Sequence, residues 1–310
     1  MKQRSPTIEG FRVMFSRPSL GLAEIAWRWT FGFFAILTLT FLVFEYFRTL
    51  PVSAGELFLL RTGHPLLISQ ALGHIFQGSA FRLFRAALML FVLLSVGWII
   101  LASWARTATV RALLNYFQND TGVMFPTISR KSPFGLNFLR VATTVGATLA
   151  CFGTFILARA ASPRTNPSPG LAMLIVLIAA VGIVFAWWLL NWMLSLAAIF
   201  VVADGSRTFT AISKSMRLWH LRWPSIMAAG AWFGIAHLIL FSLASSLVAF
   251  PLAFVGVLPP GIIMGGLLLV ALFYFAASDF LYAGKLAAYI AIAKPPATPI
   301  VVSESPALIF

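Results

Sequence analysis

The sequence has little charge and almost no cysteine. Charged residues make up 10% of its 310 residues, whereas soluble domains carry about 25%, so an ordinary soluble domain is excluded. Acidic residues are the scarcest, with eight Asp and Glu against 22 Lys and Arg. The one cysteine, Cys151, stands in an apolar run. An internal disulfide is therefore excluded, and a small core residue is favoured over a nucleophile.

Known catalytic signatures are also missing. The chain contains no HExxH of a metalloprotease, no serine and histidine in a recognisable acyl-transfer setting, no Walker phosphate loop and no CxxCH for haem. We therefore predict no catalytic residue, no metal site and no cofactor. An intramembrane enzyme with an unfamiliar arrangement stays open as an alternative.

Long uncharged runs are what the sequence has instead. The longest covers 56 residues between Arg222 and Asp279. A bilayer core of about 30 Å is crossed by roughly 20 apolar residues in a helix, which satisfies its own backbone hydrogen bonds. We predict an all-α polytopic membrane protein with amphipathic cytoplasmic elbow helices and six transmembrane helices at about 26–47, 83–105, 138–159, 171–203, 224–249 and 261–283. They form a single domain at 26–293, after a cytoplasmic segment at 1–25 and before a disordered cytoplasmic tail at 294–310.

Basic residues divide unequally between the two sides of these six spans. One side carries sixteen Lys or Arg and the other six, which predicts both termini in the cytoplasm of a bacterial inner membrane. Because these cations flank apolar spans, we expect anionic lipid partners and no nucleic acid. Trp187, Trp188 and Trp192 mark the interface if the fourth helix protrudes into the cytoplasm.

The segment 206–223 predicts a basic amphipathic helix, capped by Asp204 or Ser206 and ended by Pro224. Its apolar residues recur at steps of three and four, and its cations line another stripe. The candidate lipid-headgroup residues are Arg207, Lys214, Arg217 and Arg222. A solvated face or a surface for a protein partner is the alternative.

A similar apolar stripe follows the second span, at Val110, Leu113, Leu114 and Phe117. The matched starts Arg106-Thr107 and Arg207-Thr208 fit either a parallel repeat of helix, elbow and helix or chance similarity. On the opposite side, the spacing within 65–76 predicts a helix lying on the outer interface.

The stretch 203–223 (ADGSRTFTAISKSMRLWHLRW) carries a family resemblance in Ala211, Ser215 and Arg217-Leu218. It is similar to a cytoplasmic segment of a largely uncharacterised bacterial membrane-protein superfamily, which includes the membrane domain of some glycerophosphodiester phosphodiesterases. The resemblance covers about the last third of the chain and implies a six-helix bundle without a settled activity. No phosphodiesterase domain is present, so that catalysis is not implied.

Ionisable groups inside the spans are the remaining candidates. For Glu45 an interfacial anchor is favoured. For Asp279 we favour a structural ion pair with Lys285 or an elbow arginine over a relay of protons or ions. For His237 we favour a packing role over a ligand or proton path, because no second ionisable group stands at its depth. His64, His74 and Glu56 share an external loop, but their spacing matches no metal pattern.

These patterns favour a non-catalytic membrane protein for membrane organisation, lipid interaction or assembly of an envelope complex. A permease or transporter subunit, with elbows that dock on an energising partner, is the alternative. Mid-depth polar residues, which a transport pathway needs, are nearly limited to Asn191 and His237.

Overall fold

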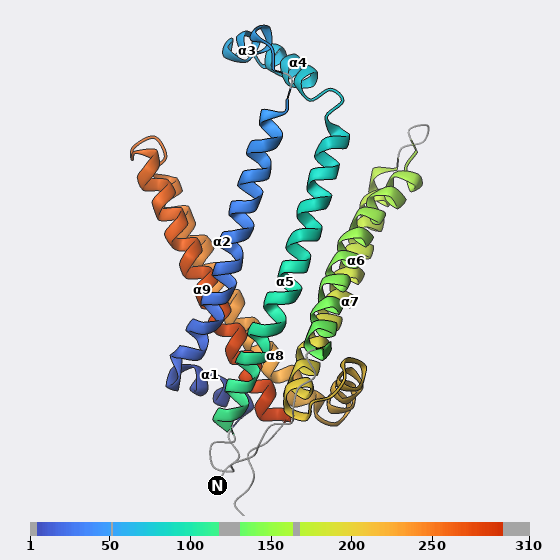
Figure 1. Ribbon diagram of the computed structural model, residues 1–310, viewed down its shortest axis with the longest axis vertical. Helices are drawn as coiled ribbons and strands as arrows, with labels where there is room; N and C mark the ends of the chain where they lie inside the picture. Colours follow the sequence, from blue (N-terminus) through green and yellow to red (C-terminus); the bar gives the residue numbers. More distant parts are fainter. Residues whose placement is uncertain (1–4, 51, 118–130, 164–167, 294–310) are drawn as a thin grey trace, which may run out of the picture. The chain divides into compact units, whose positions relative to one another are not determined.

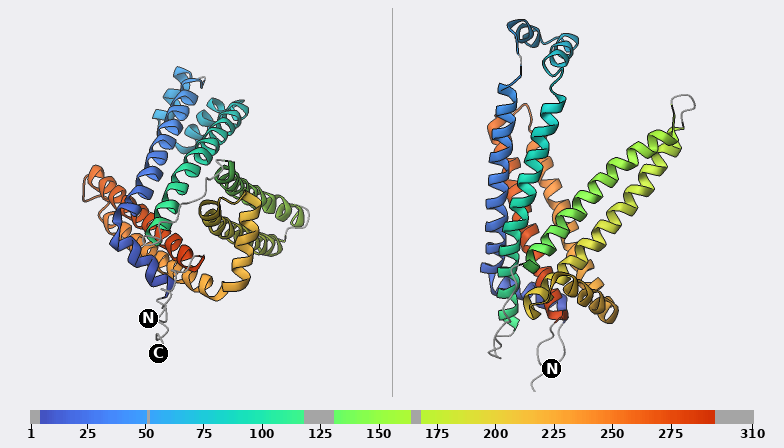
Figure 2. Two further views of the ribbon diagram at one scale, coloured as in Figure 1. Left: turned by 60° about the horizontal axis from the view of Figure 1, so that its bottom comes forward. Right: turned by 45° about the vertical axis from the view of Figure 1, so that its right-hand side comes forward.

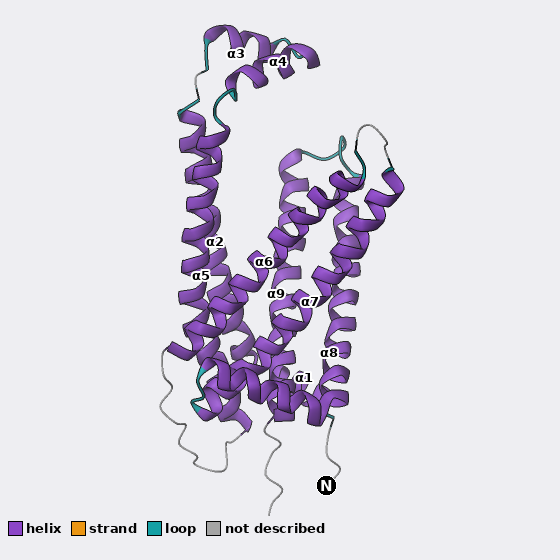
Figure 3. Cartoon of the chain, turned by 90° about the vertical axis from the view of Figure 1, so that its right-hand side faces the viewer, coloured by secondary structure: helices purple, strands orange, loops and turns teal. Residues whose placement is uncertain are grey.

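A computed structural model describes residues 5–50, 52–117, 131–163 and 168–293. The predicted all-α fold is confirmed, because these residues form helices and no strand (Figures 1 and 3). The predicted tail at 294–310 lies outside the described residues. The helices are α1 (Pro6–Ser16), α2 (Pro18–Arg48), α3 (Ala54–Arg61), α4 (Pro65–Ile75), α5 (Ala80–Phe117), α6 (Lys131–Ala161), α7 (Pro169–Asp204), α8 (Thr208–Ala253) and α9 (Pro260–Ala293).

Six of the described helices, α2 and α5 to α9, are long and apolar enough to cross a membrane. All six extend beyond the predicted spans, because the helices continue into their polar ends. The difference is largest for α8, which begins at Thr208 rather than 224. A helix is also present at α4, within the segment 65–76.

The connection from α7 to α8 contains two backbone breaks. Gly205 follows the last residue of α7 with a φ of 64°, a left-handed conformation that glycine adopts at little cost and that ends the helix. Arg222 interrupts α8 with φ −136° and ψ 29°, because Pro224 disfavours helical geometry before it. The part of α8 before this kink, 208–221, is called the elbow helix, and it runs across the direction of the remaining helix (Figure 2). The predicted separation of elbow and span thus occurs as a kink rather than a gap. The predicted caps, Asp204 and Ser206, are wrong, since the N-cap position is Arg207.

The segment after the second span differs from the elbow helix. Here α5 continues to Phe117, and Val110, Leu113 and Leu114 are at most 1% exposed. Their stripe therefore packs inside the protein, so the two matched segments of the predicted repeat play different structural roles.

The chain divides into two compact units, Met1–Ile25 with Arg106–Phe310 as unit 1 and Ala26–Ala105 as unit 2. Within unit 2, Trp98 of α5 packs on Trp27 and Phe31 of α2, with ring centroids 5.3 and 5.0 Å apart. The opposite ends of these helices are joined by Tyr46, whose hydroxyl donates to Ser79 Oγ at 2.9 Å. Aromatic packing and polar contacts thus hold α2 beside α5.

The short helix α3 of unit 2 begins with a capping box. Glu56 N donates to Ser53 Oγ at 3.3 Å, and Ser53 N donates to the Glu56 carboxylate at 2.6 Å. His74 of α4 also contacts this carboxylate. These hydrogen bonds, that of the Ser53 backbone first, hold the pKa of Glu56 below its ordinary value. The contact also ties α3 to α4.

Unit 1 contains two helix hairpins, α6 beside α7 and α8 beside α9 (Figures 1 and 2). The short helix α1, which the sequence did not reveal, packs on α9. The two backbones approach closely at Gly10, where a Cβ atom would lie 2.6 Å from the carbonyl oxygen of Gly284. Only a residue without a side chain fits there. Small residues thus set the α1–α9 contact.

The core of unit 1 lies at one end, which we call the base. It is the end where α7 and α9 finish and where α6 and α8 start. Beyond the base, long stretches of α7 and α9 expose apolar side chains such as Met173 and Phe273, at 75% and 68%. The main core cluster includes Val13, Met14, Val110, Leu113, Leu114, Trp192, Leu196, Ile199, Val202, Ile226, Phe233, Leu286, Tyr289 and Ile290.

Candidate functional site

A cavity of about 150 Å³ lies between α7 and α9 at the base of unit 1. Its walls come from 188–195 of α7 and 282–289 of α9, two helices that the core holds together. This volume exceeds the space of a single water molecule several times. Its lining consists of Trp188, Asn191, Trp192 and Ser195 of α7 with Tyr282, Lys285, Leu286 and Tyr289 of α9.

A buried aromatic pair fixes one wall of this cavity. Trp192 Nε1 donates a 2.8 Å hydrogen bond to the hydroxyl of Tyr289, which is 1% exposed. The ammonium of Lys285 lies 5.6 Å from the centroid of the Tyr289 ring, in cation–π geometry. No carboxylate forms an ion pair with Lys285 in the part of the chain that the structure describes.

A second cation, Arg140 of α6, reaches the cavity through Ser195. Its Nη2 donates to Ser195 Oγ at 3.0 Å, and Ser195 Oγ donates to the carbonyl of Asn191 at 2.8 Å. Arg140 is 8% exposed, and its Nε is buried without a hydrogen-bond partner. Within the described residues this guanidinium also has no ion pair. Two cations therefore adjoin one cavity without a counter-charge.

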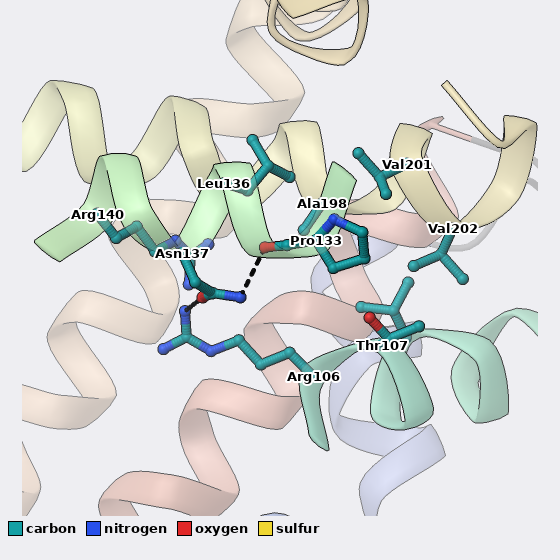
Figure 4. Close-up of a pocket in the computed structure, with 10 residues that line it drawn as sticks. Arg106, Thr107, Pro133, Leu136, Asn137, Arg140, Ala198, Val201 and Val202 are labelled. Atoms are coloured by element: carbon teal, nitrogen blue, oxygen red, sulfur yellow. Dashed lines mark hydrogen bonds between the residues drawn. The ribbon is translucent and has the colours of Figure 1, made fainter. Parts of the chain in front are cut away.

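Arg140 itself lines a separate, smaller cavity of about 20 Å³, with Arg106 and Asn137 (Figure 4). Arg106 Nη1 donates to Asn137 Oδ1 at 3.1 Å, and Asn137 Nδ2 donates to the carbonyl of Pro133 at 3.1 Å. The space suits about one water molecule. Arg140 thus lines the small cavity and contacts Ser195, which lines the larger one.

Two acidic residues, Glu24 and Asp279, are buried in unit 1. Glu24, fully buried, accepts a 2.9 Å hydrogen bond from Thr109 Oγ1. Asp279 is 9% exposed. Lys285 follows it by six residues, a separation that places the two side chains about 120° apart around α9. The structural ion pair predicted for Asp279 stays a prediction.

The four candidate headgroup residues fall into two pairs. Lys214 Nζ lies 2.8 Å from Asp204 Oδ2 and 2.9 Å from Ser206 Oγ, so it is held within the protein. Arg222 Nη1 donates to the carbonyl of Ile292 at 2.9 Å and stabilises the last turn of α9. Arg207 and Arg217 are exposed, and neither has a partner among the described residues.

The apolar stripe of the elbow helix also divides. Trp219 faces inward and packs edge-on against Trp192 of α7, with ring centroids 4.2 Å apart. Phe209 and Met216 face outward, at 78% and 47% exposed, and Trp223, directly after the kink, is 56% exposed. The Trp219 contact places the end of the elbow helix beside the cavity wall.

The other intramembrane candidates have partners consistent with anchoring and packing. Glu45 of unit 2 pairs with Arg48 at 3.4 Å on an exposed surface. His237 of α8 lies 3.2 Å from the Tyr274 hydroxyl and 3.5 Å from Ser278 Oγ, both on α9. These contacts join α8 to α9.

Sequence reasoning missed Arg140 and the role of Lys285, because both depend on contacts between distant helices. The available signal was the cluster of Trp187, Trp188 and Trp192. It indicated that the membrane interface crosses the fourth predicted span near these residues. No group of three His, Cys, Asp or Glu side chains suited to a metal occurs within the described ranges. No protein-family model, curated protein or solved structure matches the chain.

Proposed function

We propose that the protein is a non-catalytic, multi-pass protein of a bacterial inner membrane, with both termini in the cytoplasm. It acts in membrane organisation, lipid interaction or assembly of an envelope complex by binding anionic lipid at the cytoplasmic surface. The elbow helix makes this contact. The resemblance of the stretch 203–223 to the bacterial membrane-protein superfamily is part of the same proposal.

The supporting observation is the outer face of the elbow helix. Phe209 and Met216 are seven residues apart and both exposed, so they lie on one apolar stripe of a helix that crosses the direction of the spans. Trp223, directly after the kink, is exposed as well. Arg207 and Arg217 are exposed on the same element. An apolar stripe with neighbouring cations is typical of a helix that lies in the headgroup region.

The charge available for this contact is smaller than the sequence suggests. Each basic residue near an anionic surface contributes about 1 kcal/mol before screening. Four candidates would contribute roughly 4 kcal/mol by that estimate. Because Lys214 and Arg222 already bind protein groups, the two remaining arginines contribute about 2 kcal/mol.

Amide hydrogen exchange in vesicles tests the proposal. The wild type and an Arg207→Gln, Arg217→Gln variant are reconstituted into neutral and anionic vesicles. The matched control is Arg61→Gln, Arg159→Gln, which removes two exposed cations elsewhere. Anionic lipid should slow exchange across 208–221 in the wild type and the control only, and salt should weaken the effect. Equal exchange in both lipids would instead support a protein partner at the elbow.

A further inference from the structure

The cavity between α7 and α9 has the donors of an anion site. Lys285 supplies an ammonium group, Asn191 a side-chain amide and Tyr289 a hydroxyl proton. The Tyr289 proton is available because its oxygen accepts from Trp192. No Asp or Glu lines the cavity, so nothing there repels an anion.

The charges around the cavity are out of balance. Arg140 is nine-tenths buried and Lys285 is half-buried, and neither has an ion pair within the described residues. A cation removed from water without a counter-charge is strongly disfavoured. An anion in the cavity would meet the Lys285 ammonium directly and the Arg140 charge through the Ser195 hydroxyl.

The depth of the cavity indicates where that anion comes from. In α7 the exposed apolar stretch 171–190 is about 30 Å long at 1.5 Å per residue, which equals the hydrocarbon core of a bilayer. The buried residues begin directly after it, at Trp192. In α9, apart from Ile263, the buried residues likewise begin at Asp279, after the exposed stretch. The cavity therefore lies at the edge of the hydrocarbon, at headgroup level.

We propose that this cavity binds the phosphate of an anionic phospholipid headgroup, with Lys285 as the charged donor and Asn191 and Tyr289 as neutral donors. The acyl chains extend along the exposed apolar surfaces of α7 and α9. Basic cavities between membrane helices at this level suit such headgroups. The proposal deepens the lipid-binding function proposed above, but it rests on residues other than the elbow arginines.

Native mass spectrometry tests the site with titrated lipid. Phosphatidylglycerol and the zwitterionic phosphatidylcholine are added to the purified full chain, with inorganic phosphate as a separate competitor. Because a charge-assisted hydrogen bond is lost, Lys285→Gln should weaken phosphatidylglycerol binding about tenfold. The matched control Lys214→Gln removes a basal cation that does not line the cavity and should change binding less than about twofold. Lys285→Arg should retain binding.

Three outcomes decide the proposal. Unchanged phosphatidylglycerol affinity in a folded Lys285→Gln protein overturns it. Displacement of lipid by inorganic phosphate at low concentration would assign the site to a soluble phosphate and overturn the lipid source. If Lys285→Gln does not fold, amide exchange of the wild type decides. Phosphatidylglycerol should then protect 188–195 and 282–289 more than phosphatidylcholine does. Equal protection by the two lipids overturns the site.

The elbow and the cavity are separable in these experiments. The Arg207→Gln, Arg217→Gln variant should keep the tight phosphatidylglycerol site, whereas Lys285→Gln should keep anionic-lipid protection of the elbow helix. Loss of elbow protection alone would count against the proposed function and leave the cavity standing. If Lys285→Gln alone fails to weaken phosphatidylglycerol binding, the result would count against the cavity site and leave the proposed function standing.

Discussion

Replacing Gly10 with alanine should detach or strain the contact between α1 and α9. The added Cβ atom would lie 2.6 Å from the carbonyl oxygen of Gly284 and 3.0 Å from Cβ of Ala288. The first of these atoms belongs to the backbone of a buried helix, so it cannot move aside as the end of a flexible side chain could. The two helices must therefore separate or α9 must bend.

The magnitude follows from two opposing terms. Alanine favours a helix over glycine by about 0.5–1 kcal/mol, while overpacking a tight contact costs about 1–3 kcal/mol. The net loss should be about 1–2 kcal/mol. Gly10→Leu should prevent docking, which exposes the fully buried Val13 and Met14 at about 1.5–3 kcal/mol each. That loss is about 3–6 kcal/mol.

Thermal unfolding in detergent, followed by tryptophan fluorescence, measures both losses. Trypsin cleavage after Arg12, which lies inside α1, reports separately on the release and unfolding of this helix. The matched control is Gly146→Ala in α6, where an added Cβ meets nothing within 4 Å, so its Tm should stay the same or rise slightly. A Gly10→Ala protein that gains stability as the control does would refute the close contact.

Three further predictions concern charge and topology. Asp279→Asn should lower the Tm more than it alters any cellular phenotype, because Asp279 is 9% exposed within unit 1. A fully stable variant that loses a growth or transport phenotype would favour a relay of protons or ions. The lowered pKa of Glu56 means that its ionised form stabilises α3 above the ordinary value of 4.5 and that this contribution disappears as the pH falls below it. The protection factors of the amides across 54–61, which correct for the slower intrinsic exchange in acid, should therefore fall as the pH is lowered. Ser53→Ala should reduce the difference in protection between acid and neutral pH. In a Cys151→Ser background, an impermeant thiol reagent applied to intact cells should label Ser168→Cys but not Ser213→Cys, and the opposite pattern would reverse the topology.

The sequence was sufficient for the helical architecture. Uncharged runs identify the six candidate spans, because a charged side chain is strongly disfavoured in the hydrocarbon core that a spanning helix must cross. Pro224 likewise indicates the break that occurs at Arg222, since the effect of proline is local. Helix ends were harder to predict. At Lys131 and Thr208, polar residues continue helices that hydropathy cannot distinguish from loops.

Contacts between distant segments were not predictable from one sequence. Nothing in the local pattern around Gly10 reveals that it faces Gly284. The cavity is lined by α7 and α9, and a third helix, α6, supplies Arg140, which contacts the cavity only through Ser195. The elbow shows the same limit. Its periodicity correctly indicated an amphipathic helix, but it did not indicate that Trp219 packs inward while Phe209 faces outward.

The docking of α1 on α9 also constrains the order of events during biosynthesis. Gly10 leaves the ribosome about 270 residues before Gly284, its partner. At about 5–20 residues per second, the interval is roughly 15–55 s. Throughout it Val13 and Met14 lack the surface that buries them in the finished protein. The hairpins α6/α7 and α8/α9 can each pair as they emerge, whereas the base closes only when the last helix has been translated.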